Sequence, residues 1–204
     1  MIRTALEFVQ KELDAYIVDR EQDLGHYSSG HVVDLKSIIL PNGTVNLDDN
    51  FHITVMVVGI EEERREGKRP RLVRREDNQI LQLPSPVELD LFVLFTAHSS
   101  NYATALRDLS DVVGFFQANP VFDAQKYPSL NSTVEDAENK PWRVIEKLIF
   151  NLYALTFEQQ NNLWAMLGAK YMPNVVYKVK MLTVFDTKSK EKAPPISELN
   201  LNEN

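Results

Sequence analysis

The chain has 204 residues, 44% of them hydrophobic and 25% charged, and these values predict one soluble domain with a substantial core. Its formal net charge of -7 at pH 7 argues against sequence-independent nucleic-acid binding, which depends on a surplus of Lys and Arg. It contains no cysteine, which excludes disulfides and thiolate metal sites, and no apolar run near the ~20 residues that span a bilayer, which argues against membrane insertion.

The first predicted element is an amphipathic helix over residues 2–17. Its apolar residues recur at helical spacing: Ile2, Leu6, Val9, Leu13 and Ile17. Acidic residues enter its first turns, so this N-terminus does not resemble a secretory signal, and we expect a cytoplasmic protein. Residues 21–50 then carry turn signals around a short apolar segment at 32–40.

Residues 51–60 are rich in β-branched side chains and almost uniformly apolar, which predicts a central strand buried on both faces. Charges of both signs follow it, and we expect residues 61–80 to protrude as a charged hairpin arm. A solvated surface loop would explain such a run, but in an oligomer the same charges suit pairing between subunits. The candidate interface residues are Glu61, Glu62, Glu63, Arg64, Arg65, Lys68, Arg69, Arg71, Arg74 and Arg75.

A second strand is predicted over residues 87–97, where Glu88 and Asp90 indicate a solvated beginning and the later apolar residues a buried end. A helix follows over residues 101–117. Its predicted buried stripe consists of Tyr102, Ala105, Leu106, Leu109, Val113 and Phe116. Residues 123–141 form a polar connection without a period, and residues 142–154 favour a strand.

Thr156 and Gln159 form a capping box that begins a helix at Phe157. Trp164 shares an apolar stripe with its neighbours and is interpreted as a core residue, and Gly168 has the position of a left-handed helix end. The alternation after Pro173 predicts a last strand over residues 175–184. We expect residues 186–204, which are charged and contain two prolines, to be a flexible tail.

The order of these elements predicts a single α/β (α+β) domain over residues 1–185, built on one mixed sheet with helices packed mainly on one face. A metal site could be imagined from Asp23, His26, His31 and Asp34, but their spacing matches no zinc or calcium motif, and turn residues explain them better. The chain has no phosphate-binding glycine loop and no dinucleotide fingerprint. No metal, cofactor or catalytic residue is therefore predicted.

Two blocks of sequence carry a family resemblance. The first runs from Leu155 through the capped helix and Lys170-Tyr171-Met172-Pro173 to Leu182, and the second from Pro86 to Phe122, including Gly114-Phe115-Phe116-Gln117. With the strand exit Gly59-Ile60-Glu61, they resemble the cap proteins of contractile injection systems of the antifeeding-prophage and Photorhabdus virulence cassette type, which are related to phage tail terminators.

This resemblance implies a structural protein without enzymatic activity and a tail-terminator-like fold. Such a protein would form a six-fold ring on the inner-tube protein, end tube growth and give the sheath protein a point of attachment. It would be assembled in the cytoplasm and become part of a phage tail-like particle that can be released. The alternatives are a small-ligand, hydrolase-like enzyme that uses His98, Ser99 and Asp90 at a strand end, and a monomeric protein-protein adaptor.

Overall fold

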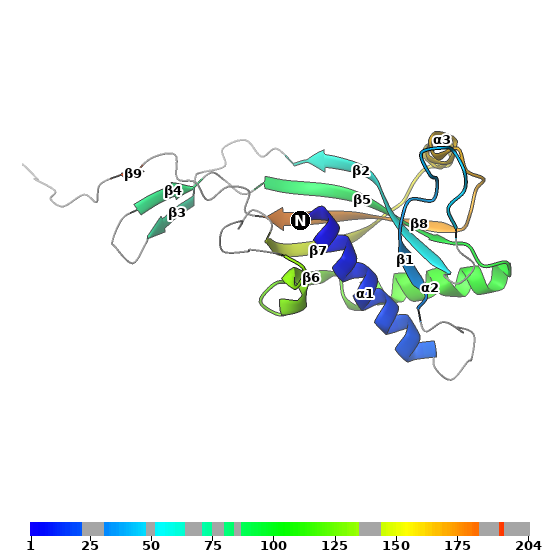
Figure 1. Cartoon of the computed structure of the whole chain (residues 1–204), viewed down its shortest axis with the longest axis horizontal. Helices are drawn as coiled ribbons and strands as arrows, with labels where there is room; N and C mark the ends of the chain where they lie inside the picture. Colours follow the sequence, from blue (N-terminus) through cyan, green and yellow to red (C-terminus); the bar gives the residue numbers. More distant parts are fainter. Residues whose placement is uncertain are drawn as a thin grey trace, which may run out of the picture.

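The computed structural model describes residues 1–21, 31–47, 52–63, 71–74, 80–83, 87–134, 144–183 and 192–193. Its main body is a six-stranded sheet with the strand order β1-β2-β5-β8-β7-β6, flanked by three α-helices (Figure 1). The strands of this sheet are β1 (Val33–Leu35), β2 (Ile53–Glu62), β5 (Val87–Ala97), β6 (Val121–Asp123), β7 (Ile145–Tyr153) and β8 (Asn174–Thr183). The helices are α1 (Ile2–Glu21), α2 (Tyr102–Ala118) and α3 (Phe157–Leu167). This is the mixed α+β fold that the element order predicts.

Strand pairing in this sheet is antiparallel except between β1 and β2, which run parallel. The long strands β5 and β8 form the centre, and they pair from Val87 opposite Thr183 to Thr96 opposite Asn174. Helices α1 and α2 cover one face of the sheet and α3 covers part of the other. The prediction of helices mainly on one face is therefore confirmed.

The core between the sheet and the first two helices is rich in aromatic rings. Phe116 of α2 stacks on Phe150 of β7 with ring centroids 4.3 Å apart, and Phe95 of β5 meets Phe116 edge-on at 5.2 Å. The predicted stripe of α1 lies in the same core, where Leu13 and Ile17 are fully buried. Burial of apolar area contributes about 25 cal/mol per Å², and this layer holds most of the buried apolar side chains of the described residues.

Helix α3 packs on the opposite face through Trp164, which is 5% exposed and belongs to the same buried cluster as Leu94 and Val176. The predicted capping box is present: the Thr156 hydroxyl accepts a hydrogen bond from the backbone N–H of Gln159, and the Gln159 side chain accepts one from the backbone N–H of Thr156. The helix ends at Gly168, whose φ of 66° is left-handed. The sequence predictions for this helix are confirmed.

Three predictions of burial are wrong. Glu88 and Asp90 are only 9% and 5% exposed, because β5 has β2 on one side and β8 on the other. In β2 only residues 53–55 are fully buried, because the short β1 covers no more of that strand. In α2 the buried face includes Asp108 at 0% exposure, whereas Tyr102 and Leu106 of the predicted stripe are 65% and 43% exposed.

Two strands of the main sheet were not predicted. Strands β1 and β6 each have three residues, which is too short for an alternating pattern to be recognised. The connection predicted to be polar contains a 3-10 helix, η2 (Pro128–Asn131), which buries Leu130 completely. In β7 a register shift between Ile145 and Lys147 places Ile145 and Leu148 in the same core, although their spacing predicts opposite faces.

A second sheet of three strands, in the order β3-β4-β9, lies beyond one end of the main sheet (Figure 1). It consists of β3 (Arg71–Arg74), β4 (Ile80–Leu83) and β9 (Lys192–Ala193). Strands β3 and β4 form an antiparallel pair, in which β3 lies within the arm predicted over residues 61–80 and β4 begins at its last residue. Apart from β9, residues 186–204 lie outside the described residues, so the prediction of a flexible tail stays a prediction.

Candidate assembly surface

The predicted interface residues fall into three sets. Glu61 and Glu62 belong to β2 of the main sheet, and the backbone N–H of Glu63 donates to the carbonyl oxygen of Glu88 at 2.9 Å, so these three residues continue the sheet and do not begin an arm. Arg71 and Arg74 are the first and last residues of β3. The others lie outside the described residues: Arg64, Arg65, Lys68, Arg69 and Arg75.

Charged side chains of β5 and β8, and Glu63 directly after β2, pair on the sheet face that carries α3. The Nζ of Lys178 lies 2.9 Å from Oδ2 of Asp90, and the Nζ of Lys180 lies 2.5 Å from Oε2 of Glu63. The hydrogen bond to Asp90 raises the pKa of the Lys178 ammonium, and the negative charges of Asp90, Glu61 and Glu63 act in the same direction. Carboxylates thus surround Lys178, and this end of the sheet is acidic.

Sequence reasoning missed the role of the two lysines, although a signal was present. Lys178 and Lys180 alternate with buried residues of β8, as Glu88 and Asp90 alternate in β5. Two strands with opposite charges at a period of two can form cross-strand ion pairs when they are neighbours. The missing information was that β5 and β8 are adjacent, which places Asp90 directly opposite Lys180.

The residues of the enzyme alternative do not form one site. Asp90 and His98 are eight residues apart along an extended strand, a separation of about 27 Å at ~3.4 Å per residue. The backbone N–H of His98 donates to the carbonyl oxygen of His52, and the Ser99 hydroxyl accepts from the N–H of Asn101 at the start of α2. His98 therefore joins the end of β5 to the residue before β2, and Ser99 holds the turn that leads into α2.

A buried ion-pair cluster near this strand end was not predicted. Asp108 is completely buried, with Oδ2 3.2 Å from Nδ1 of His52 and Oδ1 3.3 Å from the guanidinium of Arg107. A buried carboxylate requires such partners because its desolvation is costly. The cluster joins α2 to the beginning of β2, and this structural role explains why a charged residue lies at the centre of the helix face that packs on the sheet.

Two residues of the imagined metal site have protein partners. His31 lies 2.8 Å from Asp14 of α1, and Asp34 lies 2.6 Å from Lys36. Asp23 and His26 lie outside the described residues. Within the described ranges no helix combines the length and apolar composition that a membrane crossing requires.

Comparison with protein-family models gives a match to the Pvc16 N-terminal domain over residues 4–198. The chain belongs to this family. A comparison with curated protein sequences gives no significant match. The family match covers both sequence blocks that carry the resemblance and extends beyond them in both directions.

Two solved structures share the fold of this Pvc16 N-terminal domain. The anti-feeding prophage cap, described as the AFP tube terminating cap, aligns with a TM-score of 0.54 and 14% identity over 91% of this chain. The PVC sheath/tube terminator of an extracellular contractile injection system, in its extended state, aligns with a TM-score of 0.60 and 13% identity over 100% of this chain. The aligned region is 60% and 63% of the length of those two chains.

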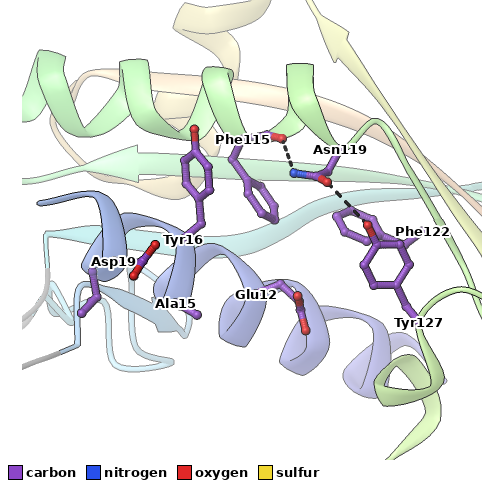
Figure 2. Close-up of a pocket in the computed structure, with 9 residues that line it drawn as sticks. Glu12, Ala15, Tyr16, Asp19, Phe115, Asn119, Phe122 and Tyr127 are labelled. Atoms are coloured by element: carbon purple, nitrogen blue, oxygen red, sulfur yellow. Dashed lines mark hydrogen bonds between the residues drawn. The ribbon is translucent and has the colours of Figure 1, made fainter.

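The Pvc16 N-terminal domain also has an open cavity of about 600 Å³ between α1 and α2 (Figure 2). Tyr16 and Phe115 form part of its wall, and Glu12 and Asp19 of α1 line it. Asn119 donates to the backbone oxygen of Phe115 at 3.2 Å and accepts from the Tyr127 hydroxyl at 3.5 Å. The Asn119 amide and the Tyr127 phenol therefore join the end of α2 to the connection that follows β6. This role in packing accounts for both side chains.

Proposed function

We propose that the chain is a structural cap that ends the inner tube of a contractile injection particle and has no enzymatic activity. The family match over residues 4–198 carries this proposal, and the fold shared with the AFP tube terminating cap and the PVC sheath/tube terminator supports it. The separation of Asp90 from His98 and the packing roles of the polar groups near them agree with a protein that acts through its surfaces.

The finer proposal is a six-fold ring that sits on the last layer of the inner tube and attaches the sheath. Tube subunits add to one another through a repeating surface. A terminator must match that surface on one side and differ from it on the other, so that growth stops. The main sheet would supply the rigid part of the ring, and the sequence of residues 61–80 would reach a neighbouring subunit.

The chain spans about 60% of the length of the two terminators it matches. Contacts that those proteins make through their remaining length are therefore not assigned to this chain. We propose assembly in the cytoplasm, followed by incorporation into the phage tail-like particle that leaves the cell. Binding of the tube protein and of the sheath protein are separate parts of the proposal and require separate measurements.

The decisive experiment is deletion of the gene followed by electron microscopy of purified particles. We expect overlong tubes or tubes without sheath, and we expect a plasmid copy of the wild-type gene to restore particles of uniform length. Particles of normal length and normal sheath in the deletion strain would refute the proposal. Light scattering of the purified protein, with and without tube protein, tests the ring separately, because a species that stays monomeric in both samples contradicts it.

A further inference from the structure

Within the described residues, part of the outer edge of β2 in the main sheet has no partner strand. Strand β1 pairs with β2 only from Ile53 to Val55, and the N–H of Lys36 donates to the carbonyl oxygen of Val55 at 3.2 Å. Beyond that point β2 is paired with β5 on its inner side, and no strand of the described residues pairs with residues 56–61 on the outer side. An open edge presents backbone N–H and C=O groups that can pair with another strand.

This edge ends in acidic residues. Ile60 is 54% exposed, and Glu61 and Glu62, the last two residues of β2, are exposed as well. The next residue is Glu63, and Asp90 lies directly opposite Glu61 on β5. A second acidic strand would be repelled here, because like charges placed opposite each other destabilise a strand pair.

In the described part of the chain, the second sheet also has an open strand edge, and the sequence of that strand is basic. Strand β3 is the terminal strand of the order β3-β4-β9 and has the sequence Arg71-Leu72-Val73-Arg74. Its inner side pairs with β4, from Arg71 opposite Leu83 to Arg74 opposite Ile80. The outer side of β3 therefore has no partner strand among the described residues, and its sequence begins and ends with an arginine.

We propose that β3 of one copy of the chain adds to the outer edge of β2 in the next copy. Pairing of β2 with β2, or of β3 with β3, would place like charges together, whereas pairing of β2 with β3 places glutamates near arginines. The two edges are different surfaces of the same chain, so the contact is heterologous and repeats around a closed ring. The inference rests on the proposed ring and specifies the interface that would build it.

The test uses the full-length chain with the photo-crosslinking residue p-benzoylphenylalanine at position 60. We expect ultraviolet light to join position 60 to residues 71–74, identified by mass spectrometry. Mixing nitrogen-15-labelled and unlabelled protein shows whether each crosslink joins two copies. The same probe at Leu152, which is 58% exposed at the end of β7, is the matched control and should give no crosslink to residues 71–74.

Charge exchange tests the reason for the pairing. Glu61→Lys with Glu62→Lys in one variant, or Arg71→Glu with Arg74→Glu in another, should each weaken self-association roughly tenfold or more in sedimentation experiments. A mixture of the two variants should associate again, because each basic edge then faces an acidic one. Circular dichroism spectra that match the wild type show that the variants fold.

Three results would overturn the proposal. They are crosslinks that join position 60 to residues 71–74 only within one copy, no such crosslink either in solution or on tubes, and no recovery of association on mixing the variants. These readouts concern the protein alone or bound to a tube and do not depend on particle length. A normal deletion phenotype would therefore refute the cap function without refuting the strand pairing, and the reverse also holds.

Discussion

Removal of the Asp14 carboxylate should destabilise the whole domain, because this side chain attaches α1 to the beginning of β1. Its Oδ1 accepts hydrogen bonds from the backbone N–H groups of Val32 and Val33 at 2.6 and 3.0 Å. These two valines are 0% and 1% exposed, so water does not replace the carboxylate easily. The second oxygen lies 2.8 Å from the imidazole of His31.

The size of the effect follows from the number of buried donors. Asp14→Ala leaves two backbone N–H groups without an acceptor at about 1–3 kcal/mol each, so we expect a loss of about 4 kcal/mol. Alanine's better helix propensity offsets less than ~1 kcal/mol of this. For a chain of this size the melting temperature should fall by roughly 8–16 °C.

Urea denaturation followed by circular dichroism measures this loss. Asp14→Asn keeps an oxygen acceptor and should lose only about 1–2 kcal/mol, because a charged acceptor is replaced by a neutral one. Asp19→Ala, a change of an exposed aspartate on the same helix, is the matched control and should stay within about 0.5 kcal/mol of the wild type. If Asp14→Ala unfolds within 1 kcal/mol of that control, on the order of experimental error, the carboxylate does not hold the two elements together.

Three further predictions concern α3 and Asp123, the last residue of β6. Trp164→Ala should lower the free energy of unfolding, measured by urea denaturation, by about 3–5 kcal/mol, and Trp164→Phe should lower it clearly less. Equal losses in the two variants would show that the volume of the buried ring does not matter at this position. Thr156→Ala, which removes the cap, should cost about 1 kcal/mol, and Gly168→Ala, at a φ of 66°, about 1 kcal/mol as well; no change in either would contradict the cap geometry. The hydrogen bond from the N–H of Gln125, and then the Lys147 ammonium, lower the pKa of Asp123, so its contribution to stability is present above the unfolded pKa and is lost as pH falls through the folded one. Carbon-13 NMR titration should show this lowered pKa of Asp123, and the pKa should be higher in the Lys147→Met variant than in the wild type. An unchanged pKa in that variant would exclude the lysine as a cause.

Local sequence was sufficient where neighbouring residues determine the structure. The capping box of Thr156 and Gln159, the left-handed end at Gly168 and the bounds of β5 depend on residues within one or two turns, and all agree with the structure. The apolar period of α1 likewise predicted its buried side correctly. The family resemblance depended on short sequence motifs in a fixed order, and the family match confirms it.

Prediction failed where burial depends on a partner far away in the chain. Asp108 lies within a helix face because His52, more than fifty residues earlier, meets its carboxylate. Asp90 is buried because Lys178 of β8 pairs with it. In both cases the charged side chain by itself predicted an exposed position. Only the structure shows which distant residue lies beside it and compensates its charge.

The sequence by itself therefore determined the three α-helices and the four long strands of the main sheet, how α3 begins and ends, and to which family the chain belongs. The tertiary structure alone decided the strand order, the burial of Glu88, Asp90 and Asp108, and which edges of the two sheets stay open. The physical reason is that backbone preferences and caps arise between adjacent residues. Ion pairs and strand pairing depend on segments that folding brings together, and their positions along the chain do not reveal which of them will meet.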